Sequence, residues 1–175
     1  VCEIKKKYKP SDILGYTVAI PGVVLNDVVV FAPNTDIFGL NFKEELGLLL
    51  ENDNIIVEND ANLQAMAEAK ATGLDDLILI SIGTGLGGGI IIDGKLLNKN
   101  GFAGEIGHIK VHFGANSRVC GCGKLGCSEA YVSCKAIVKD YNDINHTNVN
   151  SKELFDLARA KDKLAIKCIN DCARY

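Results

Sequence analysis

Two runs decide how this chain is interpreted: Gly101-Phe102-Ala103-Gly104-Glu105-Ile106-Gly107-His108 and, after a loop, Cys120-Gly121-Cys122-Gly123-Lys124-Leu125-Gly126-Cys127-Ser128-Glu129. One imidazole and three thiols, from His108, Cys120, Cys122 and Cys127, make the closed tetrahedral ligand set of a structural zinc. Intervening glycines let the backbone bring the sulfurs together. Soft sulfur ligands argue against magnesium or calcium. The C-x-C-x4-C spacing is not the commonest zinc spacing, so free thiols or a disulfide pair are the alternatives.

Two acidic residues flank this ligand set. Glu105 lies three positions before His108, and Glu129 lies two positions after Cys127. A loop stiffened by a metal would hold both carboxylates in fixed positions as hydrogen-bond acceptors. The alternative is that both are ordinary solvated glutamates.

A second candidate site lies where a short apolar strand, residues 54–58, runs into Asn59-Asp60 and a helix over residues 61–72. Gly73 is a suitable stop for that helix. A carboxylate at a helix N-terminus lies at the positive end of the helix dipole. On spacing alone, simple capping by Asn59 or Asp60 is the favoured explanation.

A glycine-rich run, Gly83-Thr84-Gly85-Leu86-Gly87-Gly88-Gly89, follows a core strand over residues 77–82. Successive glycines open backbone N–H groups to an anion, and Thr84 could add a hydroxyl donor. The Gly-Lys-Ser/Thr of a P-loop is absent, and the run leads into a strand, residues 89–92, rather than a helix. A phosphate-binding hairpin and a plain Gly-rich hairpin fit this pattern about equally.

Together these motifs resemble the signature of the ROK family, the bacterial sugar kinases and sugar-responsive repressors. Gly104–His108 and the cysteine run through Glu129 match two of its motifs, and Glu58-Asn59-Asp60-Ala61-Asn62 and Gly83–Gly89 match two more, in the family's order. The match covers roughly residues 15–135. The gap between His108 and Cys120 is a little longer than is usual in the family.

The resemblance implies an α/β fold of the ribonuclease-H-like, actin-like ATPase type with two lobes. Residues 1–74 would be the later part of the first lobe, and residues 75–175 the first part of the second. Family members are longer and begin with an Asp-x-Gly-x-Thr phosphate loop, which is not found in these 175 residues. The chain is therefore expected to be an internal fragment, incomplete at both ends and inactive by itself.

The resemblance also implies ATP-dependent phosphorylation of a hexose, with glucose as the expected sugar and Asp60 as the catalytic base. The sugar hydroxyls would be bound by Asn59, Glu105, His108 and Glu129. The ATP phosphates would face Gly83, Thr84 and Gly85, and magnesium would accompany the nucleotide. The zinc would be structural, because His108, Cys120, Cys122 and Cys127 fill its four ligand positions.

Three other functions stay open. A sugar-responsive repressor of the same family would carry a helix-turn-helix ahead of Val1. A related kinase would act on N-acetylmannosamine, N-acetylglucosamine or fructose. A zinc module without activity would leave the other motifs as coincidence. The intact Asn59-Asp60 pair and Gly83-Thr84-Gly85 favour a kinase, since a sensor needs no phosphate loop.

Composition narrows the partners further. The chain has 175 residues, 47% of them hydrophobic, and a net charge of −3, enough for one medium domain or parts of two. Slight acidity gives no basic footprint, so nucleic acid is not an expected partner. No apolar run approaches the ~20 residues of a membrane span. Seven cysteines without an export signal predict a reducing cytoplasm. Family resemblance adds a homodimer of the full-length protein.

Hydrophobic periodicity predicts the remaining elements. Strands are expected over residues 16–20 and 28–32, and a helix over residues 41–50 with Asn41 as its N-cap. Further helices are expected at 133–141, at 151–160 and from about residue 162, with a polar loop at 142–150.

Overall fold

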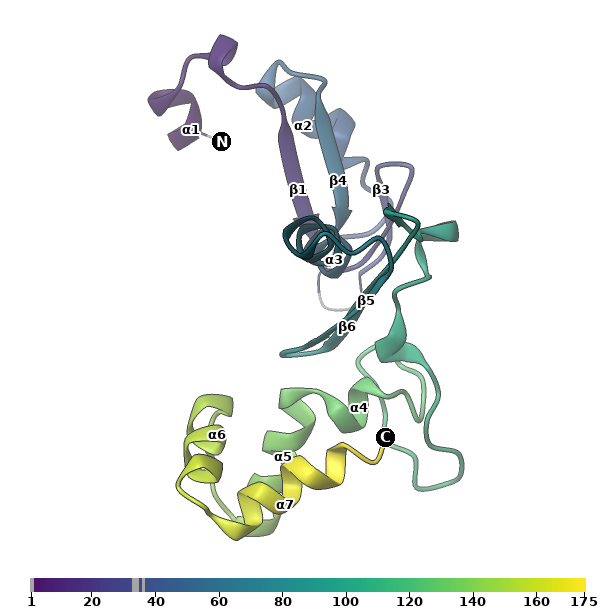
Figure 1. Ribbon diagram of the computed structural model, residues 1–175, viewed down its shortest axis with the longest axis vertical. Helices are drawn as coiled ribbons and strands as arrows, with labels where there is room; N and C mark the ends of the chain where they lie inside the picture. Colours follow the sequence, from purple (N-terminus) through teal and green to yellow (C-terminus); the bar gives the residue numbers. More distant parts are fainter. Residues whose placement is uncertain (1, 33–34, 36) are drawn as a thin grey trace. The chain divides into compact units, whose positions relative to one another are not determined.

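The computed structural model describes the chain except residues 1, 33, 34 and 36 (Figure 1). The contacts within it define two compact units, Val1–Leu77 with Gly89–Gly104 and Ile78–Gly88 with Glu105–Tyr175. After its first excursion into the second unit, the chain therefore returns to the first unit at Gly89. The lobe boundary expected between residues 74 and 75 stays a prediction.

A parallel pair of strands forms the centre of the first unit (Figure 1). β1 (Tyr16–Ile20) pairs with β4 (Ile55–Asn59), with Tyr16 opposite Ile55 and Ile20 opposite Asn59. This register places Asn59 at the carboxyl end of the pair, where both strands end. Polar residues that follow parallel strands gather at this edge of a sheet.

The rest of this unit packs around the strand pair. β2 (Val23–Leu25) and β3 (Val28–Phe31) form an antiparallel pair, and α2 (Phe42–Leu50) begins at Asn41, whose side chain caps it as expected. β2 had no counterpart in the sequence analysis. Preceding elements are α1 (Cys2–Lys7) and the 3-10 turn η1 (Pro10–Asp12). The core comprises Ile20, Val24, Val29, Ala32, Leu50, Ile55 and Val57.

α3 (Asp60–Thr72) follows β4 without a break. It ends at Gly73, whose backbone is left-handed at φ 71°, a conformation that glycine adopts without strain. Its start at the Asn-Asp pair and its end at Gly73 confirm the helix expected there.

Three strands, β5 (Leu77–Ile82), β6 (Leu86–Ile92) and β7 (Lys95–Leu96), form a sheet in that order. β6 starts three positions earlier than expected, because Leu86, Gly87 and Gly88 belong to the strand rather than to the loop. A Cβ at Gly89 would lie 2.5 Å from the Cβ of Ala65 on α3, so glycine is needed for close strand–helix packing. Two 3-10 turns follow, η2 (Lys99–Gly101) and η3 (Ile106–His108).

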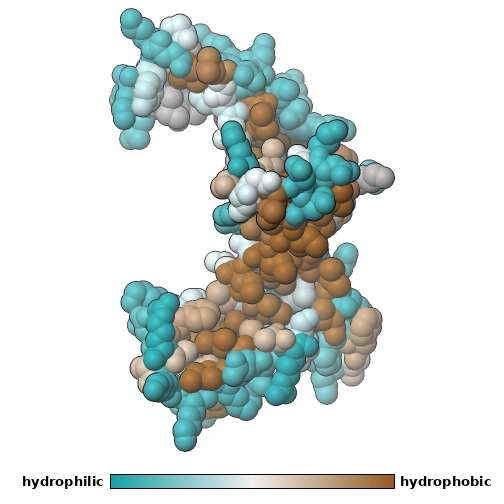
Figure 2. Space-filling view, viewed as in Figure 1, coloured by the Kyte–Doolittle hydropathy of each residue, from teal (hydrophilic) through white to brown (hydrophobic). Residues whose placement is uncertain are grey.

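Helices make up the end of the second unit: α4 (Glu129–Val132), α5 (Cys134–Asn145), α6 (Ser151–Arg159) and α7 (Lys163–Cys172). Their buried core comprises Ile137, Tyr141, Leu154, Ala165 and Cys168. Hydrophilic side chains cover much of the outer surface of α6 and α7, in the lower part of Figure 2. None of the described helices has the length and apolar character needed to cross a membrane.

α5 is longer than expected, and the loop at 142–150 is correspondingly shorter. The helix runs to Asn145 and is closed by His146 in a left-handed conformation. The side chain of Asn142 accepts from the N–H of Val149 at 2.9 Å and donates to its carbonyl at 2.9 Å, which stabilises the turn into α6. Asn150 and Glu153 then form a capping box at the start of α6.

Candidate functional site

The four expected zinc ligands come together in the second unit. The ligand atoms of His108, Cys120, Cys122 and Cys127 all lie within 4.8 Å of one another. Cys122 Sγ is 3.8 Å from Cys127 Sγ, and Cys120 Sγ is 3.7 Å from His108 Nδ1. A tetrahedral zinc with Zn–S bonds of about 2.3 Å puts neighbouring sulfurs about 3.8 Å apart. The residues therefore fit a four-coordinate zinc.

The alternative of a disulfide does not fit this geometry. Cys120, Cys122 and Cys127 are free thiols. Their sulfurs are too far apart for a disulfide bond, which has a length of about 2.05 Å. All four ligands of the cluster are also supplied by one compact unit, and a full set of four protein ligands is typical of a structural site.

Backbone geometry of the cysteine run explains how the sulfurs converge. The Cys120 N–H donates to the Lys124 carbonyl at 2.8 Å, and the Gly123 N–H donates back to the Cys120 carbonyl at 2.9 Å. Gly126 has φ 81°, and a Cβ there would lie 2.0 Å from the His112 carbonyl oxygen. The tight turn therefore needs glycine at this position.

Without a cation, the three thiols have unequal acidities. Burial raises the pKa of Cys120 to about 12 and also raises the pKa of Cys127. Burial acts in the same direction on Cys122, but a backbone hydrogen bond from Lys124 and the S–H groups of Cys120 and Cys127 together lower the pKa of Cys122. A bound divalent ion would offset the cost of ionising the buried thiols, because metals coordinate the thiolate form.

His108 presents its two ring nitrogens to different partners. Nδ1 faces Cys120 Sγ, while Nε2 lies 3.7 Å from Glu105 Oε2. With Nδ1 on a metal, Nε2 carries the proton and becomes a dependable donor. The expected metal ligand His108 and the expected sugar residue Glu105 are thus neighbours in the structure.

Glu129 bridges the cysteine cluster and the glycine hairpin. Its Oε2 accepts from the Leu86 N–H at 3.1 Å, and its Oε1 accepts from the Cys120 S–H at 3.5 Å. The Oε2 contact contradicts the alternative of an ordinary solvated glutamate, because the carboxylate has a backbone donor far away in the chain.

The hairpin expected to face phosphate joins β5 to β6. The Gly83 N–H donates to the Gly85 carbonyl at 3.0 Å, which closes the turn around Thr84. A Cβ at Gly83 would meet no atom within 4 Å, so this side of the turn is open. Thr84 is exposed. These features are compatible with an anion site and with a plain hairpin.

Asn59 and Asp60 lie in the first unit, at the junction of β4 and α3. Asn59 Oδ1 accepts from the N–H groups of Ala61 and Asn62 at 2.9 and 3.0 Å, and its Nδ2 donates to the Gly22 carbonyl at 3.0 Å. Asn59 is therefore the helix cap that spacing favoured. Asp60 Oδ1 accepts from the Ala61 N–H at 2.9 Å, and within the described part of the chain Oδ2 has no partner. Asp60 is exposed, so one carboxylate oxygen is available.

Glu58, directly before Asn59, is a further polar residue of this junction that the motif spacing did not single out. Its Oε1 accepts from the Asn59 N–H at 2.8 Å and from Asn62 Nδ2 at 3.0 Å, and its Oε2 accepts from Asn98 Nδ2 at 3.0 Å. This carboxylate ties the junction before Asp60 to the segment after β7. No local signal identifies Asn98 as its partner, since 40 positions separate them.

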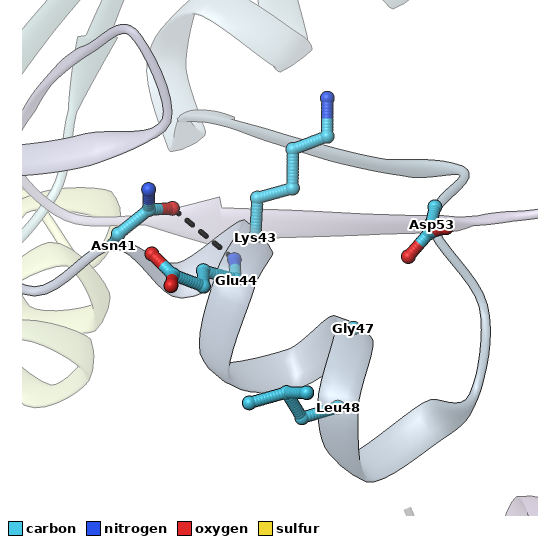
Figure 3. Close-up of a pocket in the computed structure, with 6 residues that line it drawn as sticks. All are labelled: Asn41, Lys43, Glu44, Gly47, Leu48 and Asp53. Atoms are coloured by element: carbon cyan, nitrogen blue, oxygen red, sulfur yellow. Dashed lines mark hydrogen bonds between the residues drawn. The ribbon is translucent and has the colours of Figure 1, made fainter.

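A shallow pocket of about 410 Å³ lies apart from all these residues, beside α2 (Figure 3). It is lined by Asn41, Lys43, Glu44, Gly47, Leu48 and Asp53. The hydrogen bond drawn there is the helix cap, from the Glu44 N–H to Asn41 Oδ1 at 3.2 Å. None of the expected site residues lines this pocket.

Comparison with known proteins assigns the chain to a family. The family model of the ROK family matches residues 2–175. A glucokinase of Halalkalibacterium halodurans is 32% identical over 94% of this chain and 56% of that protein. A xylose repressor of Bacillus subtilis is 32% identical over 95% of this chain and 44% of that protein. A Streptomyces griseus ROK glucokinase, solved with glucose and AMPPNP, is 34% identical with a TM-score of 0.80, over 89% of this chain and 56% of that one.

The fold is thus that of the ROK sugar kinases, the actin-like ATPase type that the sequence predicted. The chain belongs to the ROK family. It spans about half the length of the curated relatives it matches.

Proposed function

We propose that the full-length protein is an ATP-dependent hexose kinase that converts glucose to glucose 6-phosphate. The single observation that carries this proposal is Asp60. Its exposed carboxylate stands at the first position of α3, and one oxygen has no partner within the described residues. A sugar sensor needs no such base, whereas phosphoryl transfer to a hydroxyl benefits from one.

In the proposed reaction the sugar 6-hydroxyl oxygen attacks the γ-phosphorus of ATP. The bond from the γ-phosphorus to its bridging oxygen breaks, ADP leaves, and Asp60 takes the hydroxyl proton. Catalysis of this kind depends mainly on positioning and charge neutralisation. Gly83, Thr84 and Gly85 would face the phosphates, with the Thr84 hydroxyl as a donor, and magnesium bound with ATP would neutralise the phosphate charge.

Sugar recognition would use four polar side chains. The remaining hydroxyls would meet Asn59, Glu105, His108 and Glu129. Because Asn59 Oδ1 caps α3 and its Nδ2 donates to the Gly22 carbonyl, a contact with sugar would share one of these two atoms. His108 Nε2 and Glu105 would act as a donor and acceptor pair, which their 3.7 Å separation supports.

Zinc would have a structural role at the sugar side of this site. His108 Nδ1 and the sulfurs of Cys120, Cys122 and Cys127 would hold it. When bound, it supplies charge that keeps the thiols ionised and fixes the imidazole tautomer. Four protein ligands leave no coordination position for a reacting water.

A second candidate is a sugar-responsive repressor, favoured by the similarity to a xylose repressor. A third is a kinase for another sugar, such as N-acetylmannosamine, N-acetylglucosamine or fructose. These candidates share the zinc cluster and differ in what the Asn59-Asp60 junction does.

The deciding experiment measures ADP release by the full-length protein with magnesium-ATP and a panel of sugars: glucose, mannose, fructose, N-acetylglucosamine and N-acetylmannosamine. Turnover on glucose is expected, and Asp60→Asn should lower kcat by about a hundredfold or more while glucose still binds. Asp143→Asn, an exposed aspartate on α5, is the matched control with unchanged turnover. Sugar binding without any turnover would favour the repressor.

A further inference from the structure

We propose that the segment Cys127–Cys134, which starts at the last zinc ligand, holds the Gly83–Gly85 hairpin in place. Zinc would then support the nucleotide side of the active site as well as the sugar side. That the hairpin binds nucleotide rests on the proposed function. The attachment of the hairpin to the segment Cys127–Cys134 does not rest on that function, because all the residues involved lie in the second unit.

Two hydrogen bonds hold the hairpin from opposite strands. The Cys134 N–H donates to the Gly83 carbonyl at 2.9 Å, where β5 has just ended. The Leu86 N–H, at the start of β6, donates to Glu129 Oε2 at 3.1 Å. One donor and one acceptor from the same short segment thus fix both ends of the turn. Bonds to a carboxylate are stronger than those between neutral groups.

Close packing at the same place reinforces this attachment. A Cβ on Gly85 would lie 2.5 Å from Glu129 Oε2, and a Cβ on Gly107 would lie 2.1 Å from the Leu86 carbonyl oxygen. Glycine is therefore needed at position 107 for the observed approach, and a side chain at position 85 would displace the Glu129 carboxylate. Gly107 belongs to the run that ends at His108, so both zinc-bearing stretches reach the hairpin.

The segment is itself anchored to the metal cluster through the backbone. Cys127 is a ligand, and Ser128 next to it donates from its N–H to the Ile109 carbonyl at 2.9 Å and from its Oγ to the Ile106 carbonyl at 2.6 Å. These bonds connect it to the turn that carries His108. Loss of zinc would free both stretches at once.

The two oxygens of Glu129 would then have separate tasks. Oε2 stays on the Leu86 N–H. Oε1 lies 3.5 Å from Cys120 Sγ and faces the metal cluster. A single carboxylate would therefore link the cluster to the hairpin.

Amide hydrogen exchange of the full-length protein tests the link without any turnover assay. Removing zinc with a chelator should speed exchange at residues 83–86 about tenfold, because a hydrogen bond to a charged group is lost. Exchange at the core of α5, around Ile137 and Tyr141, should stay unchanged. Faster exchange confined to residues 105–129, or an equal rise in α5, would overturn the proposal.

Removing the backbone N–H of residue 134 tests the attachment of the hairpin separately from the proposed function. Cys134 is the first residue of α5, a position that accepts proline, and Ser133 before it has the extended conformation that proline prefers (φ −63°, ψ 152°). Cys134→Pro removes the N–H that holds Gly83, whereas Cys134→Ala keeps it.

For Cys134→Pro we expect affinity for magnesium-AMPPNP to fall about tenfold, with zinc content and glucose affinity unchanged. Cys134→Ala should bind nucleotide like the wild type. Equal nucleotide affinity in both variants would overturn the link. Absence of nucleotide binding by the wild type would overturn the proposed function instead, and hydrogen exchange would still decide the link.

Discussion

At the scale of single residues, the three thiols expected to bind zinc differ in their pKa values. Crowding and burial raise the pKa of two of the three thiols, most strongly at Cys120. A dication would reverse that cost by binding thiolates, so these residues are suited to hold a metal. His108 joins the cluster through Nδ1 and faces Glu105 with Nε2.

A substitution in this cluster tests the role of the metal. Cys122→Ser in the full-length protein should weaken zinc binding and lower glucose affinity about tenfold, since an oriented ligand shell is lost. The kcat at saturating substrates should stay close to that of the wild type, because the metal takes no part in the chemistry. Metal analysis and glucose titration are the measurements.

Cys172→Ser is the matched control, because Cys172 is a partly buried thiol outside the cluster. It should leave zinc content and glucose affinity unchanged. Unchanged glucose affinity and stability in Cys122→Ser would show that the metal does not support the sugar site.

At the scale of elements, helix starts are set by local side chains and helix positions by buried ones. Asn41, Ser133, Asn150 and Asp162 each accept a hydrogen bond from a backbone N–H in the first turn of their helix. Such caps contribute roughly 1 kcal/mol each. In the second unit, Leu154 of α6 is completely buried against α5 and α7, which fixes the arrangement of the three helices.

Leu154→Ala should therefore lower the free energy of unfolding of the second unit by about 3 kcal/mol, through lost apolar burial and the cavity left behind. Leu48→Ala is the matched control, since Leu48 on α2 is 78% exposed. It should change stability by less than about 0.5 kcal/mol. Denaturant unfolding of the full-length proteins measures both, and equal midpoints would contradict the assigned core.

At the scale of the whole molecule, the expected active-site residues are divided between two units. Asn59 and Asp60 belong to the first unit, while the zinc cluster, Glu129 and the hairpin belong to the second. An apolar row on β5, Ile78, Ile80 and Ile82, is more than half exposed within this chain. Apolar sheet faces of this kind are usually contact surfaces.

The chain spans about half of its relatives, and the family's Asp-x-Gly-x-Thr phosphate loop is not among its residues. We therefore expect the 175 residues by themselves to bind zinc, with about one ion per chain, but to release no ADP with glucose and ATP. The full-length protein in the same assay is the control. Turnover by the isolated chain would show that these 175 residues suffice for phosphoryl transfer.

The sequence by itself determined the parts of this protein that depend on local chemistry. Caps and glycine stops gave α2, α3 and α6 nearly correct bounds, because these signals act within one turn. The four residues expected to hold zinc do lie together, with their ligand atoms within 4.8 Å of one another, because ligand spacing and intervening glycines limit how cysteines can converge. Zinc itself stays a prediction. Ordered motifs were enough to assign the family.

Only the tertiary structure decided which distant residues meet. Glu129 binds the Leu86 N–H across 43 positions, and Glu58 binds Asn98 across 40. Residue 89 has to be glycine because Ala65 on α3 leaves no room for a side chain there. Such contacts depend on how elements pack, and nothing in the immediate neighbourhood of either residue encodes them.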